Sequence, residues 1–145
     1  MPIKKCSDQS PKTFKEFYTE VSTWPNQFRE ISKKMISFLD LIDDTFKETQ
    51  LWGHTSHTNL VIQNKDLTCS ERLVIVENHG LDQYQFSYLL PKRKRAWEYA
   101  RVHGGEGANI KEAKKYLLIA MRESEAWEGN LEFERLLEEN GLNRL

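Results

Sequence analysis

The spacing of the hydrophobic residues changes twice along this chain, and each change limits which secondary structure can form. Over residues 13–47 the hydrophobic side chains recur at steps of three and four, which places them on one stripe of a helix. The stripe comprises Phe14, Phe17, Tyr18, Val21, Phe28, Ile31, Met35, Phe38, Leu39, Ile42 and Phe46. Pro25 interrupts it, because proline cannot continue helical hydrogen bonds but suits the first turn of a new helix. We expect a short helix, a corner, and a long helix from about Pro25 to Lys47.

The middle of the chain has the composition and alternation of β-strands. Residues 58–63 and 72–77 contain runs of branched aliphatic side chains, and the second run is typical of a strand covered on both faces. Residues 83–90 alternate between large apolar and polar side chains, which indicates a half-buried strand. Residues 99–102 could add a fourth strand. This pattern predicts an antiparallel meander of three to four strands.

Helical spacing returns near residue 109. Asn109 precedes Glu112 by three residues, which is the arrangement of a capping box at a helix start. Asn130 is placed to cap a last helix, and Gly141 with Leu142 is placed to end that helix in a Schellman motif.

The expected element order is ααββββαα, an α+β fold in which N-terminal and C-terminal helices pack against the sheet. The length of 145 residues corresponds to one domain. We expect residues 1–145 to form this single domain, with the polar residues 1–12 flexible.

The composition favours a folded cytoplasmic protein and excludes several classes. Hydrophobic residues make up 39% of the chain and aromatic residues 11%, which is more apolar surface than a disordered chain carries. No segment approaches the roughly 20 apolar residues of a membrane span, and no apolar stretch near the start resembles a signal peptide. Cys6 and Cys69 are too few for a disulfide-rich secreted scaffold. The net charge of −1 gives no overall excess of basic residues for binding a polyanion.

The most pronounced local charge is a run of four adjacent basic residues: Lys92, Arg93, Lys94 and Arg95. Four neighbouring cations repel one another, so folding alone does not call for them. They could grip phosphates, with Trp97 or Tyr99 as a stacking platform. They could equally meet an acidic protein surface and steer its approach, or lie in a solvated loop. The candidate binding residues are therefore this basic run, at residues 92–95, and Trp97.

A second candidate is the glycine-rich segment at residues 104–107, directly before the expected helix start at Asn109. Such a segment could expose main-chain amides to a phosphate at the helix N-terminus. It lacks the Gly-Lys-Ser/Thr of a P-loop and the spacing of a dinucleotide fingerprint, and Glu106 would repel an anion. The plain alternative is a flexible connection from strand to helix. A phosphate site would be better supported if this segment and the basic run were neighbours in space.

Signals for metal binding and catalysis are weak. His54 and His57 are three residues apart and could chelate one ion on a turn or helix, but a polar turn that enters a strand explains them more simply. The sequence holds no nucleophile elbow, and Cys69 lies in a polar loop without an adjacent base. We therefore expect no cofactor, and an enzyme or a metal protein is the third hypothesis.

These observations favour a cytoplasmic protein-binding module that acts by occluding a partner's surface, without membrane attachment. In size, near-neutral charge and α+β build the chain resembles small bacterial or phage-encoded binding proteins, such as toxin-immunity proteins and inhibitors, which implies a protein partner. The alternative is a nucleic-acid or phosphate-binding protein that uses the basic run and the glycine-rich segment. An edge strand at residues 58–63 or 99–102 could also pair with a second copy or another chain.

Overall fold

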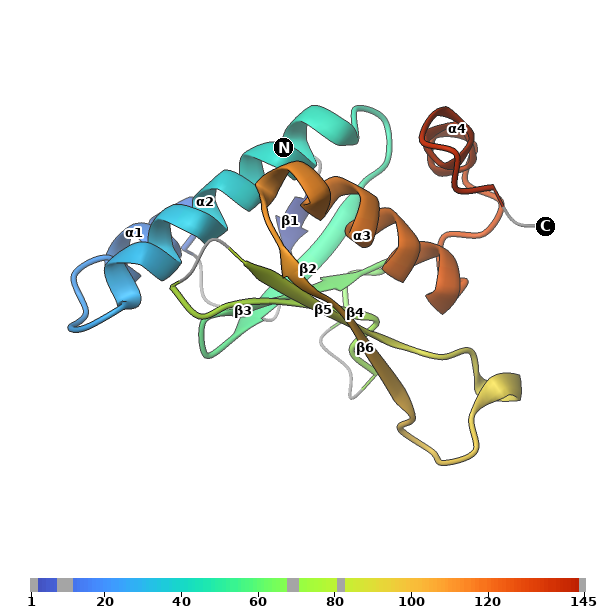
Figure 1. Ribbon diagram of the computed structural model, residues 1–145, viewed down its shortest axis with the longest axis horizontal. Coiled ribbons are helices and arrows are strands. Elements are labelled where there is room, and N and C mark those ends of the chain that lie inside the picture. Colours follow the sequence, from blue (N-terminus) through green and yellow to red (C-terminus); the bar gives the residue numbers. More distant parts are fainter. Residues whose placement is uncertain (1–2, 8–11, 68–70, 81–82, 144–145) are drawn as a thin grey trace.

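The computed structural model describes residues 3–7, 12–67, 71–80 and 83–143, which form a six-stranded sheet and four α-helices (Figure 1). The strands are β1 (Ile3–Lys5), β2 (Leu51–Ser56), β3 (Asn59–Gln63), β4 (Val74–Asn78), β5 (Tyr84–Leu89) and β6 (Arg101–Ala108). The helices are α1 (Phe14–Val21), α2 (Phe28–Thr45), α3 (Ile110–Ser124) and α4 (Leu131–Glu139), with a short 3-10 helix η1 (Lys92–Lys94). Strands follow one another across the sheet in chain order, and only β1 and β2 pair in parallel.

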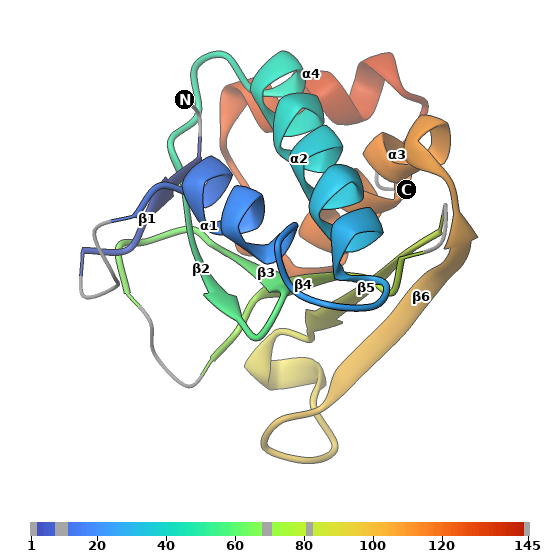
Figure 2. The same cartoon turned by 90° about the vertical axis from the view of Figure 1, so that its left-hand side faces the viewer.

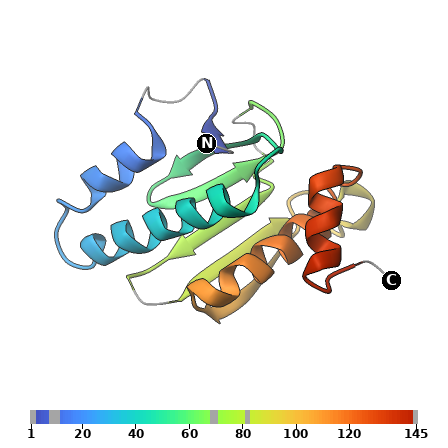
Figure 3. The ribbon, with the colours of Figure 1, turned by 90° about the horizontal axis from the view of Figure 1, so that it is seen from above.

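One face of the sheet carries α1, α2 and α3, and α4 lies near the C-terminal end of α3 (Figures 1 and 3). Alternate strand side chains pack against the helices in one hydrophobic core, which includes Leu60, Ile62, Val74, Val76, Phe86, Met35, Phe38, Leu39, Leu117 and Met121. Two tyrosines are fully buried because their hydroxyls have partners: Tyr18 donates to the Thr58 carbonyl oxygen at 2.9 Å, and Tyr84 to that of Lys34 at 2.6 Å. The stripe predicted for residues 13–47 is thus the buried face of α1 and α2.

The α+β class is confirmed, but the predicted order ααββββαα is wrong. A strand precedes α1, and five strands follow α2, so the sheet has six strands where three to four were expected. The strands expected at residues 58–63, 72–77 and 83–90 correspond to β3, β4 and β5, each within two residues at either end.

The first strand lies in a segment that was expected to be flexible. Ile3 and Cys6 are each 1% exposed, and the Cys6 amide donates to the Gly53 carbonyl oxygen at 2.8 Å. The strand pairs with residues that follow both N-terminal helices, so no local pattern could reveal it. Residues 1–2 and 8–11 of that segment lie outside the described residues.

The second strand was missed because its sequence does not alternate and has Gly53 at its centre. A Cβ at Gly53 would lie 2.7 Å from the Val61 carbonyl oxygen and 3.2 Å from Cζ of Phe14. Glycine therefore lets α1 approach β2 closely. His54 belongs to this strand, and the polar turn expected around it is confined to the hairpin at His57, whose φ is 57°.

The sequence signals at the helix ends proved reliable. Asn109 forms a capping box with Glu112, and the Asn130 side chain accepts a hydrogen bond from the Phe133 amide at 2.9 Å. The Leu142 amide donates to the carbonyl oxygen of Leu137 at 2.8 Å, as the Schellman motif requires. These caps set the bounds of α3 and α4.

The long helix begins slightly later than predicted. α2 starts at Phe28 and not near Pro25, because Asn26 takes a left-handed φ of 65° and completes the corner after α1.

Candidate functional site

The chain between β5 and β6 extends beyond the sheet and carries the whole basic run (Figures 1 and 2). We call residues 92–99 the hairpin head. Arg95 ties its base together: Nε donates to the Leu90 carbonyl oxygen at 2.6 Å, and Nη1 donates to that of Glu98 at 3.0 Å. Nη1 also lies 3.2 Å from the Glu71 carboxylate, and the Arg95 side chain is only 9% exposed. Arg95 is thus an internal brace of the hairpin.

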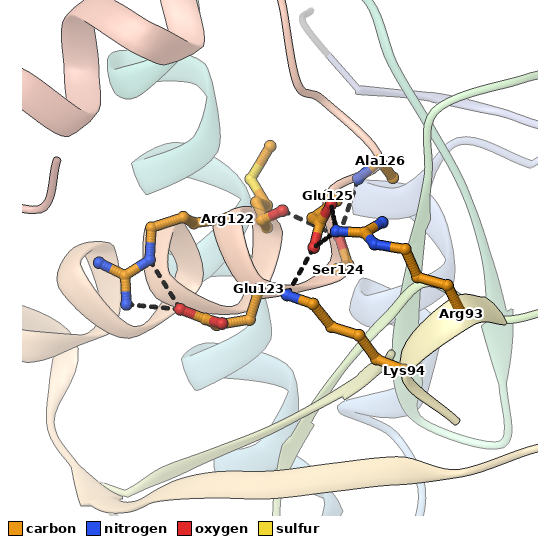
Figure 4. A network of polar contacts seen from close by, with 8 residues as sticks. Arg93, Lys94, Arg122, Glu123, Ser124, Glu125 and Ala126 are labelled. Atoms are coloured by element: carbon orange, nitrogen blue, oxygen red, sulfur yellow. Dashed lines mark hydrogen bonds and ion pairs between the residues drawn. The ribbon is translucent and has the colours of Figure 1, made fainter. Parts of the chain in front are cut away.

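Arg93 and Lys94 are held by one carboxylate at the end of α3 (Figure 4). Glu125 caps α3 with a left-handed φ of 60°, and its carboxylate lies 2.6 Å from Arg93 Nη2 and 2.8 Å from Lys94 Nζ. Hydrogen bonds from Lys94 and Arg93 lower the pKa of Glu125 to about 2. The carboxylate is therefore ionised at neutral pH and fastens the hairpin head to α3.

The basic run has a structural purpose that the sequence did not suggest. Three of its four cations have partners inside the molecule, and Lys92 is the member for which the described residues supply no ion pair. The basic run therefore does not present four unpaired positive charges to a ligand.

Two aromatic side chains of the hairpin region point into solvent. Trp97 is 79% exposed and Tyr99 is 56% exposed. They line an open groove of about 680 Å³ together with Glu71, Lys92, Arg95, Ala96 and Glu98. Its charged side chains are two cations and two carboxylates, so the groove is electrically mixed and combines apolar rings with balanced charge.

The glycine-rich segment is not the loop that was expected. Residues 104–107 belong to β6, which starts near the predicted residue 99–102 strand but runs on to Ala108. A register shift between Tyr84 and Phe86 accommodates extra β6 residues, and Gly105 has a φ of 71°. A Cβ at Gly105 would lie 2.9 Å from Cδ2 of Phe86, so glycine serves packing here.

The basic run precedes β6 in the hairpin head, whereas the glycine-rich segment lies farther along β6. Arg101, which pairs with Leu89, begins the strand next to the hairpin head, whereas Ala108 pairs with Tyr84 at the far end (Figure 2). This arrangement gives no support to a single phosphate site built from both.

The two histidines of the metal hypothesis differ in their surroundings. His54 is 5% exposed within β2, whereas His57 is exposed in the β2–β3 turn. Within the residues that the structure describes, no group of three or more His, Cys, Asp or Glu side chains could hold a metal ion. Cys69 lies outside the described residues, and Cys6 is buried.

Sequence reasoning missed a polar cluster on the sheet face opposite the helices. It comprises the side chains of Ser87, Arg101 and His103 together with the Arg72 carbonyl oxygen, which accepts a hydrogen bond from Arg101, and Ser87 faces His103 across the β5–β6 pair. Arg101 and His103 are two residues apart, a spacing that would have placed them on one face had their strand been predicted at its full length.

Comparisons with known proteins gave no match: no family model matches the chain, and neither does a curated protein or a solved structure. Among the described residues no helix is long and apolar enough to span a membrane.

Proposed function

We propose that this chain is a protein-binding module whose contact surface is the hairpin head, with Trp97 as the anchor. The observation that carries the proposal is the 79% exposure of Trp97 on a hairpin held by internal ion pairs. Tryptophan is enriched among the residues that dominate binding energy at protein interfaces. Because the hairpin is already fastened to α3, binding would order few additional groups, which lowers the entropic cost.

The charges of the groove favour a protein over a nucleic acid. Glu71 and Glu98 line the groove together with Lys92 and Arg95. A phosphate backbone would meet two carboxylates there, and nucleic-acid affinity depends chiefly on a surplus of cations. A protein surface with its own mixed charges around an apolar pocket matches this arrangement better.

The experiment places a photoreactive amino acid at Ala96 and, as a matched site, at Leu131. Leu131 is an exposed apolar residue on α4, at 81% exposure, outside the hairpin head. We expect the photoreactive group at residue 96 to cross-link to a single protein, and we expect this cross-linked product to remain after nuclease treatment. The affinity of the purified partner is then measured for Trp97→Ala and for Leu131→Ala.

Loss of Trp97 should weaken that affinity by about tenfold or more, as is typical of an interface anchor. Leu131→Ala should bind like the parent chain. Equal affinities for Trp97→Ala and the parent chain would contradict the proposal. Cross-linking that disappears with nuclease would favour the nucleic-acid alternative.

A further inference from the structure

The sheet face that points away from α1, α2 and α3 has no α-helix of the described chain over it (Figures 1 and 3). Several side chains on this face are nevertheless nearly inaccessible, and on β5 these are Ser87 at 3% exposure and Leu89 at 2%. Arg101 faces Leu89 from β6, and its guanidinium group reaches over to Ser87. The side chain of Arg101 therefore lies along this face and contacts Ser87.

Hydrogen bonds hold the Arg101 guanidinium in one place. Its Nε and Nη2 donate to Ser87 Oγ at 3.3 Å and 3.1 Å, and its Nη1 donates to the Arg72 carbonyl oxygen. These three bonds use three of the five N–H groups of a guanidinium. Two N–H groups remain for a ligand, on a group whose orientation is already set.

Among the described residues, no carboxylate lies within ion-pair distance of Arg101, although the charge of Glu77 acts on it from farther away. No ion pair of Arg101 or Arg72 occurs within the described ranges, and Arg72 Nη1 donates to the neutral Ser56 Oγ at 3.0 Å. Burial lowers the pKa of Arg101 to about 10, and the charge of Arg72 acts in the same direction, whereas Glu77 opposes it. The group remains charged at neutral pH, and the charge of Arg72 adds to its electrostatic cost, so an anion bound at the Arg101 guanidinium would relieve that cost.

We propose that Arg101 and Arg72 form a binding site for one phosphate group, carried by inorganic phosphate or a small phosphomonoester. A guanidinium fork matches the geometry of phosphate oxygens and binds them through charge-assisted hydrogen bonds. The exposed Arg72 supplies a second, adjustable cation, and His103 lies beside Ser87 as a further donor.

The surroundings limit the ligand to a small one. Glu77 lines a cavity of about 110 Å³ together with Ser87 and His103, and Glu71 lies next to Arg72 in the chain. Because the charge of Glu77 acts on Arg101, each further negative charge on a ligand adds repulsion, so the site favours a single phosphate group over an extended polyanion. The site thus differs in place and in ligand from the hairpin head.

The test is a titration of the full chain with sodium phosphate at constant ionic strength, followed by amide and arginine Nε–Hε NMR signals. We expect saturable shifts at Ser87, Arg101 and His103 that sodium chloride does not reproduce. Arg101→Gln should weaken phosphate binding about tenfold or more, and Arg101→Lys by less, because lysine keeps the charge but loses the fork.

Matched variants keep the outcome interpretable. Arg135→Gln removes the same charge from an exposed position on α4 and should leave the affinity unchanged. Arg72→Gln alters an exposed side chain, so it tests the site even if Arg101→Gln fails to fold. Trp97→Ala should bind phosphate like the parent chain, which separates this site from the proposed protein-binding surface.

Several results would overturn the proposal. One is a set of NMR shifts that sodium chloride reproduces, and another is a set of shifts spread over all basic residues. A third is an equal loss of phosphate affinity in Arg135→Gln and Arg72→Gln. Binding of a single-stranded oligonucleotide far more tightly than a nucleoside monophosphate would replace it with nucleic-acid recognition.

Discussion

At the scale of single residues, two glutamates join parts of the chain that are distant in sequence. Glu125 binds Arg93 and Lys94 of the hairpin head. Glu132, in the first turn of α4, accepts hydrogen bonds from the main-chain amides of residues 47–49 at 2.8 to 2.9 Å. Both carboxylates satisfy several donors at once, which makes the folded state sensitive to their ionisation.

Glu125→Gln should loosen the hairpin head and change how stability depends on pH. The pKa of Glu125 falls from its usual 4.5 to about 2 in the folded chain, so the unfolded state binds more protons between these values. Its stabilising contribution is therefore complete above about pH 4.5 and is lost as pH falls toward 2. Thermal melts from pH 7 to pH 2 should show a lower Tm for the variant at pH 7 and a smaller decline below pH 4.5.

The control for this prediction is Glu138→Gln, an exposed carboxylate on α4. It should leave the acid decline intact. If the Tm of both variants falls with pH as that of the parent chain does, the ion pairs of Glu125 contribute nothing to stability.

Glu132→Gln should destabilise the whole fold. Burial raises the pKa of Glu132, but hydrogen bonds from Thr49 and the amides of Lys47 and Glu48 lower it more, and the net pKa lies below its usual range. A glutamine amide is neutral, so the charge-assisted hydrogen bonds are lost, and its NH₂ group faces main-chain donors. The free energy of unfolding should fall by about 2 kcal/mol. Urea denaturation at pH 7 measures the loss, and the exposed Glu139→Gln should stay within about 0.5 kcal/mol of the parent chain.

At the scale of elements, helices were predictable and the outer strands were not. The helices carry both a periodic stripe and capping residues, two independent signals that agreed at Asn109 and Asn130. The central strands β3, β4 and β5 carry branched or alternating side chains. β1 depends on a parallel pairing with a distant segment, β2 does not alternate and has Gly53 at its centre, and β6 contains glycines that resemble a loop, so local patterns could not identify them.

Two glycines in strands should respond oppositely to alanine. At Gly53 the added Cβ meets the Val61 carbonyl oxygen, and overpacking of this kind costs about 1–3 kcal/mol. At Gly104 nothing lies within 4 Å of an added Cβ, so Gly104→Ala should be neutral or slightly stabilising. Urea denaturation of both variants checks the contrast, and equal stabilities would show that β2 accommodates a Cβ at residue 53 against β3 and α1 without cost.

At the scale of the whole molecule, the predicted site residues lie together, but most of their charge is used internally. The sequence predicted a binding site at residues 92–95 and Trp97, and the structure places these residues in one hairpin. The ion pairs with Glu125 could not be foreseen, because they join segments more than thirty residues apart. The Arg101–Ser87 contact was equally hidden, since it depends on the pairing register of β5 and β6.

The parallel pairing of β1 with β2 also has a consequence for the order in which the chain folds. Each strand from β3 to β6 pairs with the strand that precedes it in the chain. The sheet from β2 to β6 can therefore grow as successive segments leave the ribosome. β1 is made before the other strands of the sheet, yet its neighbour becomes available only after α1 and α2 have been synthesised. Until Leu51 emerges, Ile3 lacks the strand beside which it is buried, and β1 waits longer for its partner than the strands made after it.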